Sequence, residues 1–344
     1  LMSNVGARTI VFVPLNKTSE LLTTVYDFPA AAVRARAVMT NTQPTVPYRS
    51  AGRPEAMFIM ERLVDIAARR HGFDRVELRR RNLISEDAMP YRTALGLTYD
   101  SGQLERAMDR ALEMGDWDGF PARRDEARSR GRLRGIGLAN YIEITSGFPV
   151  ERSDITVNSS GSVEVVIGTT SSGQGHATSF TQCVAEWLGV PFGDVHMVAG
   201  DTDIVKEGGG SHSARSMRMA GIVMGKASDL IIERGQEIAA GMLEVAAADI
   251  SFADGRFTIT GTDRSVGIFD VAAVAEAGSD GPLSGACQEM MQFPGYPYGA
   301  QVCEVEVDRE TGSVEVIRYA AVDDVSRAID PLIVHGQSHG GAVQ

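Results

Sequence analysis

Three glycine-rich segments of the sequence carry side chains that could bind an anion, and each stands before an expected helix. They are residues 168–176 (GTTSSGQGH), 208–216 (GGGSHSARS) and 336–337 (GQ). The beginning of a helix exposes unpaired backbone N–H groups and carries partial positive charge, so it attracts phosphate. Glycine lets the backbone approach an anion closely, and serine and glutamine side chains add donors. Together the three segments predict a large ligand with several phosphates or polar groups.

An ordinary nucleotide site is not indicated by these segments. No GK[ST] follows the glycines, as a Walker A loop requires, and no GxGxxG motif opens a strand–helix–strand unit. Any one of the segments alone is more typical of a turn followed by a helix cap. The anion-binding interpretation therefore depends on the occurrence of all three in one chain.

A fourth segment, residues 47–56 (PYRSAGRPEA), places two arginines just before another expected helix. If Arg49 and Arg53 are buried, each guanidinium needs an anion or a carboxylate as its partner. Two interpretations remain open from the chemistry alone. The arginines bind a ligand, or they form salt bridges near the helix N-terminus.

Helix and strand signals surround these segments. Pro54 and Gly72 bound one expected helix, and a basic helix follows from about residue 74, with residues 79–81 (RRR) expected to face outward. A strand over 135–144 and a hairpin over 155–167 come next. The other expected elements are short strands and loops over the first thirty residues, a helix over 104–112, a charged surface segment at 121–132, helices over 174–188, about 213–247 and 271–277, and short strands at 195–198 and 250–259.

A weak internal duplication is visible in the sequence. Residues 161–166 (GSVEVV) recur as 312–317 (GSVEVI), and residues 173–176 (GQGH) recur as 336–339 (GQSH). In both places a hairpin is expected before a loop with Gly-Gln at a helix start. The repeated β-β-α unit predicts an α+β, or mixed α/β, fold.

Composition limits the classes of protein that the chain could be. It has 344 residues, of which 43% are hydrophobic, and a formal net charge of −12, which disfavours nucleic acid as a partner. Three cysteines without a CxxC motif fit reduced thiols. We find no signal peptide and no apolar run of membrane-spanning length, and expect a cytoplasmic protein. Both ends look cut, so we expect a longer polypeptide.

Several segments resemble, in order along the chain, the molybdenum-cofactor-binding large subunits of the xanthine dehydrogenase/aldehyde oxidase family. Residues 48–56, followed by 61–63 (ERL) and 77–82 (ELRRRN), resemble that family's active-site loop and the helices after it. Residues 173–176 resemble its pterin-binding loop. The other similar segments are 200–203, 208–216, 299–308, 323–324 and 336–341. The resemblance implies two cofactor-binding domains: part of the first over 1–132, and the second, truncated at its C-terminus, over 133–344.

The resemblance also implies an activity. Members of the family are hydroxylases that oxidise an aldehyde or an N-heterocyclic substrate and take the oxygen from water. Their molybdenum is held by a molybdopterin, in bacteria usually the cytosine dinucleotide form, and not by protein side chains. Electrons leave through [2Fe–2S] clusters and often FAD, which implies an iron–sulfur subunit, an FAD subunit and an oligomer. The alternative is a non-catalytic, cofactor-free fragment or scaffold.

Carried over residue by residue, the resemblance implies roles for fourteen positions. Arg49 and Gln174 are the expected catalytic residues, while the general-base Glu of the family lies beyond this sequence, so we expect the chain alone to be inactive. Ala51, Tyr141 and Glu143 are expected to line the substrate pocket, although Glu143 could equally be a strand-end carboxylate that faces water. The expected cofactor-binding residues are Arg49, Ser50, Gly173, Gln174, Gly175, His176, Ser213, Ala214, Arg215, Ser216 and Gln337.

The sequence departs from two branches of that family. Copper-containing carbon monoxide dehydrogenases have a Cys where this chain has Ser50, which counts against CO as the substrate. The xanthine-type loop carries a bulky Phe, whereas Ala51 and Gly52 are small, so stacking of a purine is not predicted.

Overall fold

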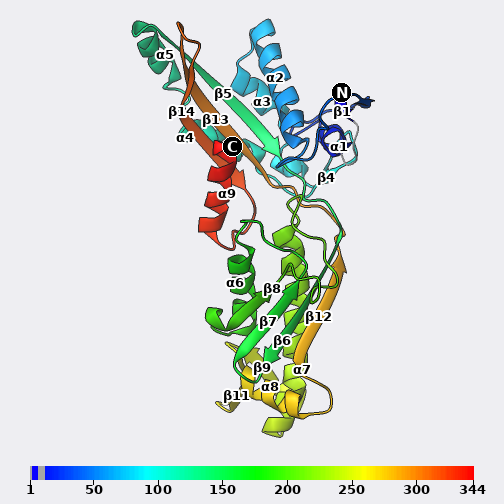
Figure 1. Cartoon of the computed structure of the whole chain (residues 1–344). Coiled ribbons are helices and arrows are strands. Elements are labelled where there is room, and N and C mark those ends of the chain that lie inside the picture. Colours follow the sequence, from blue (N-terminus) through cyan, green and yellow to red (C-terminus); the bar gives the residue numbers. More distant parts are fainter. Residues whose placement is uncertain (1, 7–11) are drawn as a thin grey trace. The chain divides into compact units, whose positions relative to one another are not determined.

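The structure of the chain, a computed structural model, describes residues 2–6 and 12–344 (Figure 1). These residues divide into two compact units. The first runs as far as Ile144 and includes Gly295–Ser326, and the second is Thr145–Pro294 with Arg327–Gln344. Each unit contains helices and a sheet of three or more strands, which confirms the predicted mixed class.

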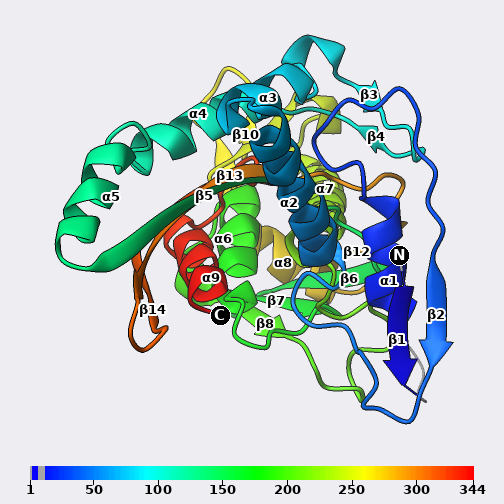
Figure 2. The ribbon, with the colours of Figure 1, turned by 90° about the horizontal axis from the view of Figure 1, so that it is seen from above.

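The first unit is organised around a three-stranded antiparallel sheet with the order β14-β13-β5. Leu138 lies opposite Val302, which lies opposite Ala320 on the third strand, and helices α4 and α5 pack on the sheet (Figure 2). The elements of this unit are β1 (Met2–Gly6), α1 (Phe12–Glu20), β2 (Arg36–Met39), α2 (Arg53–His71), α3 (Arg75–Asn82), a 3₁₀ turn (Glu86–Ala88), β3 (Tyr91–Arg92), β4 (Thr98–Tyr99), α4 (Leu104–Met114), α5 (Phe120–Ser129), β5 (Arg132–Ile142), β13 (Tyr298–Asp308) and β14 (Val314–Asp324).

Helix α2 begins and ends, and helix α3 begins, where the sequence signals predicted. Gly72 ends α2 with φ 74°, a left-handed conformation that glycine adopts without steric cost. Asp74 caps α3, because its carboxylate accepts from the N–H groups of Val76 and Glu77, both at 2.8 Å. Two predictions for this unit were incomplete: α1 lies where only strands and loops were expected, and α5 lies in the charged surface segment. The part of the first prediction that concerns residues 1 and 7–11 lies outside the described residues.

Arg79 corrects the expectation that the three arginines of α3 all face outward. Its side chain is fully buried and donates from Nε to Glu61 Oε2 at 2.7 Å and from Nη1 to Asp65 Oδ1 at 2.9 Å. Its Nη2 also donates to the carbonyl oxygens of Glu61 and Leu138. The two carboxylates of α2 supply the counter-ions that the sequence pattern of α3 could not reveal, and they allow the charge to be buried.

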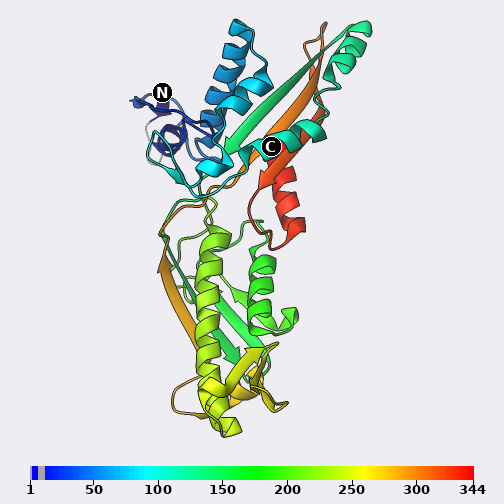
Figure 3. The same ribbon diagram turned by 180° about the vertical axis from the view of Figure 1, so that it is seen from behind.

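The second unit contains a four-stranded sheet with the order β12-β6-β7-β8, in which β7 and β8 run parallel. Helix α7 packs along β12 and β6, and α6 packs against α7 and β8 (Figure 3). The elements are β6 (Val150–Asn158), β7 (Ser162–Ile167), α6 (His176–Leu188), a 3₁₀ turn (Phe192–Asp194), β8 (Val195–Val198), α7 (Ser216–Leu243), a 3₁₀ turn (Ala247–Asp249), β9 (Ile250–Ala253), β10 (Arg256–Ile259), β11 (Ser265–Gly267), α8 (Ile268–Ala277), β12 (Leu283–Met290) and α9 (Pro331–Val343).

The order of elements repeats as the internal duplication predicted. Strands β6 and β7 precede α6, and strands β13 and β14 precede α9. The predicted position of the third segment was nevertheless wrong, because residues 336–337 lie inside α9 and not before it. The helix starts earlier because Asp330 accepts from the N–H of Ile333 at 3.1 Å and Pro331 occupies its first position.

The compact units do not follow the chain in two continuous halves. Strand β13 returns late in the sequence to pair with β5 over its whole length, which joins residues 298–324 to the first unit. The predicted boundary between residues 132 and 133 concerns cofactor-binding domains, and it stays a prediction. Within the described part of the chain, no helix is long and apolar enough to cross a membrane.

Arg79→Met should lower the free energy of unfolding by about 3–5 kcal/mol, because Glu61 would remain buried without its counter-ion. Arg81→Met, on the same helix, should cost less than about 0.5 kcal/mol, since Arg81 is exposed and pairs only with Glu77 one turn away. Urea unfolding of both variants tests this difference. Equal losses would contradict the structural role of Arg79.

Candidate functional site

The first predicted loop connects β7 to α6 in the second unit. Gly173 and Gly175 have φ values of 104° and 75°, and Gly175 is the N-cap of α6. Gln174 folds onto its own loop, where its Oε1 accepts from the N–H of Ser172 at 2.5 Å. Among the described residues no side chain caps α6, and its first turn holds no acidic residue. The N–H groups at this helix start therefore suit an anion.

The second predicted loop leads into α7, which begins at Ser216 and not near Ser213. Ser213 and Ala214 have φ values of 53° and 57°, a left-handed conformation that costs a residue other than glycine about 1–3 kcal/mol. One bond that holds them runs from the N–H of Ser146 to the carbonyl oxygen of Ser213 at 3.0 Å. Such strain persists only where the surrounding structure imposes it, and it is common in ligand-binding loops.

The two loops are bonded to each other. The hydroxyl of Ser211 donates to the carbonyl oxygen of Thr170 and lies 3.4 Å from His176 Nδ1. A Cβ added to Gly168 would lie 2.2 Å from the Cα of Gly208, so the backbones touch at a point where only glycine fits. The structure thus brings the two sets of predicted donors together within this unit.

His176, predicted to bind cofactor, supports the loops from inside. It is 8% exposed, and its ring stacks on Phe180 with centroids 4.8 Å apart. Burial lowers the pKa of the imidazole, which favours the neutral ring. The neutral ring keeps one acceptor nitrogen and one N–H donor for neighbouring loop groups.

Arg215, another predicted cofactor-binding residue, is fully buried beneath the second loop. It donates to Glu151 Oε2 at 2.8 Å, to the carbonyl oxygen of Gly210 at 2.7 Å and to that of Val150 at 2.8 Å. Because its side chain is 0% exposed, Arg215 supports the loop from beneath.

Sequence reasoning missed Glu151, although a signal for it was present. Strand β6 alternates strictly, and Glu151 and Ser153 share the buried face with Ile155 and Val157. A carboxylate at an inward position of such a strand needs a partner that neutralises its charge. Extending the pattern Ile155–Val157 backwards by two positions at a time would have pointed to Glu151.

In the first unit, the loop before α2 has three successive residues with positive φ: Ser50 at 75°, Ala51 at 32° and Gly52 at 94°. Thr18 holds this loop, because its hydroxyl donates to the carbonyl oxygen of Gly52 at 2.9 Å. A Cβ on Gly52 would lie only 2.2 Å from the carbonyl oxygen of Pro14. The loop therefore rests directly on the backbone of α1.

The structure separates the two arginines of this loop. Arg49 lies in the exposed stretch that includes Tyr48, whereas Arg53 is 4% exposed and its Nε lies 2.7 Å from Glu143 Oε1. Arg53 also donates to the carbonyl oxygens of Ser50 and Ile144 at 3.1 and 2.8 Å. Of the two interpretations left open by the sequence, the salt bridge holds for Arg53.

Glu143 and Tyr141 are both held by other side chains of the first unit. The side chain of Glu143 is 19% exposed, so it is not the water-facing carboxylate of the alternative, and its Oε2 accepts from Ser50 Oγ at 3.2 Å. Burial raises the pKa of the Glu143 carboxyl although Arg53 opposes that shift. Tyr141 donates from its hydroxyl to Asp323 Oδ1 at 2.6 Å, and burial raises its pKa.

The fourteen predicted residues thus fall into two groups, one in each unit. Arg49, Ser50, Ala51, Tyr141 and Glu143 lie in the first unit. The second unit contains Gly173, Gln174, Gly175, His176, Ser213, Ala214, Arg215, Ser216 and the partly buried Gln337 of α9.

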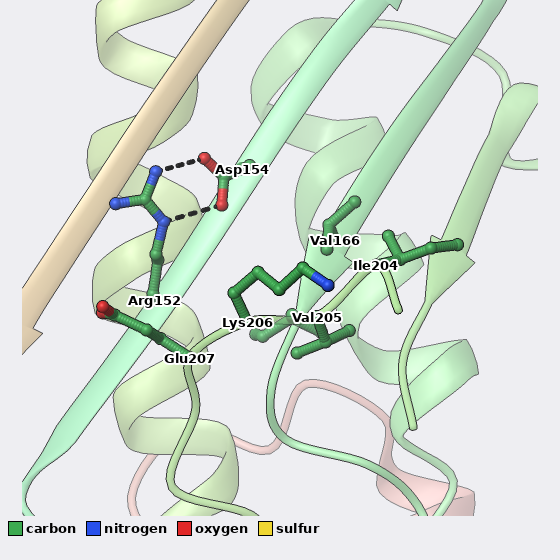
Figure 4. A pocket seen from close by; sticks show the side chains of 8 residues that line it. Arg152, Asp154, Val166, Ile204, Val205, Lys206 and Glu207 are labelled. Carbon is green, nitrogen blue, oxygen red and sulfur yellow. Dashed lines mark hydrogen bonds and ion pairs between the residues drawn. The ribbon is translucent and has the colours of Figure 1, made fainter. Parts of the chain in front are cut away.

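An open pocket of about 400 Å³ lies on the outward face of β6 and β7 and contains none of the predicted residues (Figure 4). Arg152 points into it and pairs with Asp154, with Nη2 and Oδ1 2.6 Å apart. The segment with Ile204, Lys206 and Glu207 forms its other wall. Arg152 and Glu151 are neighbours in β6, so one faces this pocket and the other the buried loops.

Gly52→Ala should destabilise the protein by more than Gly72→Ala, although both residues have positive φ. The added methyl group at residue 72 meets no atom within 4 Å and adds only the left-handed backbone cost of about 1–2 kcal/mol. The methyl group at residue 52 also collides with α1 and must displace the loop. Thermal unfolding of both variants measures the difference, and similar losses would show that the close contact is unimportant.

Comparisons with known proteins identify relatives along nearly the whole chain. The chain is 32% identical over 330 residues to the 6-hydroxypseudooxynicotine dehydrogenase complex subunit gamma of Paenarthrobacter nicotinovorans, and 33% identical over 343 residues to the carbon monoxide dehydrogenase large chain of Hydrogenophaga pseudoflava. Each comparison covers 93% of this chain and 42% of the relative. Quinoline 2-oxidoreductase from Pseudomonas putida 86 has the same fold, with a TM-score of 0.89 and 30% identity, over 99% of this chain and 46% of that one.

The chain thus spans less than half the length of these relatives. Two family models match it, both described as a molybdopterin cofactor-binding domain, over residues 1–83 and 110–344. The first match contains the loop before α2, and the second contains both bonded loops. The chain therefore belongs to the molybdopterin cofactor-binding domain family, and its relatives place it among the molybdenum-binding subunits of the xanthine dehydrogenase family.

Proposed function

We propose that this chain is part of a molybdenum-dependent hydroxylase that oxidises an aldehyde or an N-heterocycle with water as the source of oxygen. One observation carries the proposal: both family models describe molybdopterin binding, and the second spans the two loops whose donors are bonded together. The relatives support the reaction class, since one is named a dehydrogenase subunit and another a quinoline oxidoreductase.

The residues of the second unit fit an anionic pterin nucleotide. Within the described chain, neither α6 nor α7 has an acidic residue in its first turn or a side chain that caps it. Their N–H groups bind the phosphates, the hydroxyls of Ser213 and Ser216 add donors, and the amides of Gln174 and Gln337 orient the pterin. When it is bound, the cofactor supplies a redox-active molybdenum centre. The net negative charge of the protein is unfavourable to an anionic ligand, so the ligand must be bound by donors close to it. Backbone N–H, hydroxyl and amide groups are such donors.

The loop before α2 in the first unit is the proposed substrate-binding segment. Arg49, Ser50 and Ala51 lie beside the substrate in this proposal, and the small Ala51 leaves room for a heterocyclic ring. Glu143 keeps its orientation through Arg53, and Tyr141 through Asp323. Copper-containing carbon monoxide dehydrogenases have a Cys at this position, and copper favours a thiolate ligand. Since this chain has the hydroxyl of Ser50 there, we propose an organic substrate in preference to CO.

Partner proteins and the exact cofactor are further parts of the proposal. Two of the relatives are named as a complex subunit and a large chain, which supports assembly with other subunits. We propose an iron–sulfur subunit and an FAD subunit as the electron acceptors, the cytosine dinucleotide form of the molybdopterin, and a cytoplasmic oligomer.

Metal and nucleotide analysis of the full-length protein, purified with its partner subunits, tests the proposed function. We expect about one molybdenum atom per polypeptide, and about one cytidine nucleotide released by acid hydrolysis. This ratio follows from the proposal that the two bonded loops together bind one cofactor molecule. Preparations that are folded by circular dichroism but contain neither would refute the proposal.

Gln174→Ala should reduce kcat by about a hundredfold to a thousandfold, or about 3–4 kcal/mol, because it removes a donor that the bound cofactor would cover in this proposal. The variant should lose much less stability than activity, since the side chain bonds only within its own exposed loop. Gln236→Ala is the matched control: its amide bonds the carbonyl oxygen of Ile250, away from the loops. Turnover that is unchanged in Gln174→Ala would remove this residue from the proposed site.

A further inference from the structure

The ion pair between Glu151 and Arg215 is completely shielded from solvent. Both side chains are 0% exposed, and Arg215 Nη1 lies 2.8 Å from Glu151 Oε2. Glu151 is near the start of β6, and Arg215 is the last residue before α7. The pair therefore connects the start of the internal strand β6 to the end of an irregular loop.

Glu151 accepts hydrogen bonds from both glycine-rich loops at once. Its Oε2 accepts from the hydroxyl of Thr169 in the first loop at 2.5 Å, and from the N–H of Gly209 in the second loop at 3.2 Å. Its Oε1 accepts from the N–H of Arg152 at 3.2 Å. One carboxylate thus fixes the distance between the two segments.

Arg215 completes this arrangement with Nη1 and Nη2. It bonds the carbonyl oxygens of Gly210 and Val150, and a Cβ on Gly209 would lie 2.5 Å from its guanidinium carbon. The second loop is wrapped so tightly around the guanidinium that a side chain at residue 209 would collide with it.

Apolar packing does not fix the loops in the same way. Residues 170–173 are exposed, and in 208–216 only Arg215 is fully buried. A buried ion pair has a large desolvation cost, and replacing it with apolar residues is often neutral for stability, so its value lies in specifying a geometry. Here the geometry that it specifies is the relative position of two glycine-rich segments.

We propose that Glu151 and Arg215 are positioning residues, which hold the two loops as a single donor surface for the anionic part of the cofactor. This inference rests on the proposed function and adds two residues to it. Neither contacts the ligand: Arg215 and Glu151 act through Thr169, Gly209 and Gly210, whose backbones set the direction of the donors around them.

The test compares variants of the full-length protein purified with its partner subunits. Glu151→Gln and Arg215→Met each break the pair, and Glu151→Met/Arg215→Met removes both charges. Val223→Ala, a cavity in the core of α7, is the control for stability alone. Three quantities are measured for each: the unfolding midpoint, molybdenum and cytidine nucleotide per polypeptide, and the rate of tryptic cleavage after the exposed Lys206.

Both single variants should contain about tenfold less molybdenum and nucleotide than wild type, the loss typical when a group behind a ligand is removed. Cleavage after Lys206 should be about tenfold faster, because the second loop loses a charged anchor. The double variant should regain the unfolding midpoint but not the cofactor, since apolar side chains restore packing without the bonds to the loops. Val223→Ala should lower the midpoint and leave cofactor content and cleavage rate near those of wild type.

Two results would overturn the inference. The first is single variants whose cofactor content and cleavage rate match those of Val223→Ala at equal stability. The second is a double variant that regains both stability and cofactor, because charge compensation alone would then explain the pair. A wild-type protein without molybdenum would instead refute the proposed function, and the cleavage rates would still decide whether the pair holds the loops.

Discussion

Buried arginines paired with glutamates hold the loops before α2 and α7 and the junction of α2, α3 and β5. Arg53, Arg79 and Arg215 are each at most 4% exposed, and each bonds a glutamate of another element. Each also donates to at least two backbone carbonyl oxygens. A loop that enters the interior leaves carbonyl groups without the ladder partners of a helix or sheet. The five donors of a guanidinium satisfy several such groups at one point.

The ion pairs allow an acidic protein to orient hydrogen-bond donors toward an anion. With a net charge of −12, the chain as a whole repels a phosphate. Because the charge of Arg215 is neutralised by Glu151, the donors that the two loops of the second unit offer to a ligand are backbone N–H groups and uncharged side chains. Their strength depends on orientation, so the accuracy of the loop geometry matters more here than the total charge.

Much of the regular structure could be predicted from the sequence, and a salt bridge was one of two interpretations for Arg53, whereas the ion pairs of Arg79 and Arg215 could not be predicted. Pro54, Gly72 and Asp74 are local signals, and the helices that they bound formed as expected. The burial of Arg79 depends on a glutamate in another helix, and that of Arg215 on Glu151 in a strand, so no spacing within α3 or the second loop reveals it. The Gly-Gln pair at 336–337 gave a wrong helix start because Asp330 and Pro331 are stronger start signals. The predicted site residues gathered in two groups, but their contacts with a ligand stay predictions.

The late return of β13 to β5 has a consequence for biosynthesis. Strand β5 leaves the ribosome roughly 160 residues before the strand that pairs with it, a long-range contact that slows assembly. The whole sheet β12-β6-β7-β8 is translated within that interval. The four-stranded sheet of the second unit can therefore form on the nascent chain while β5 is still unpaired. A chaperone that shields β5 during this delay would protect its unpaired edge from aggregation.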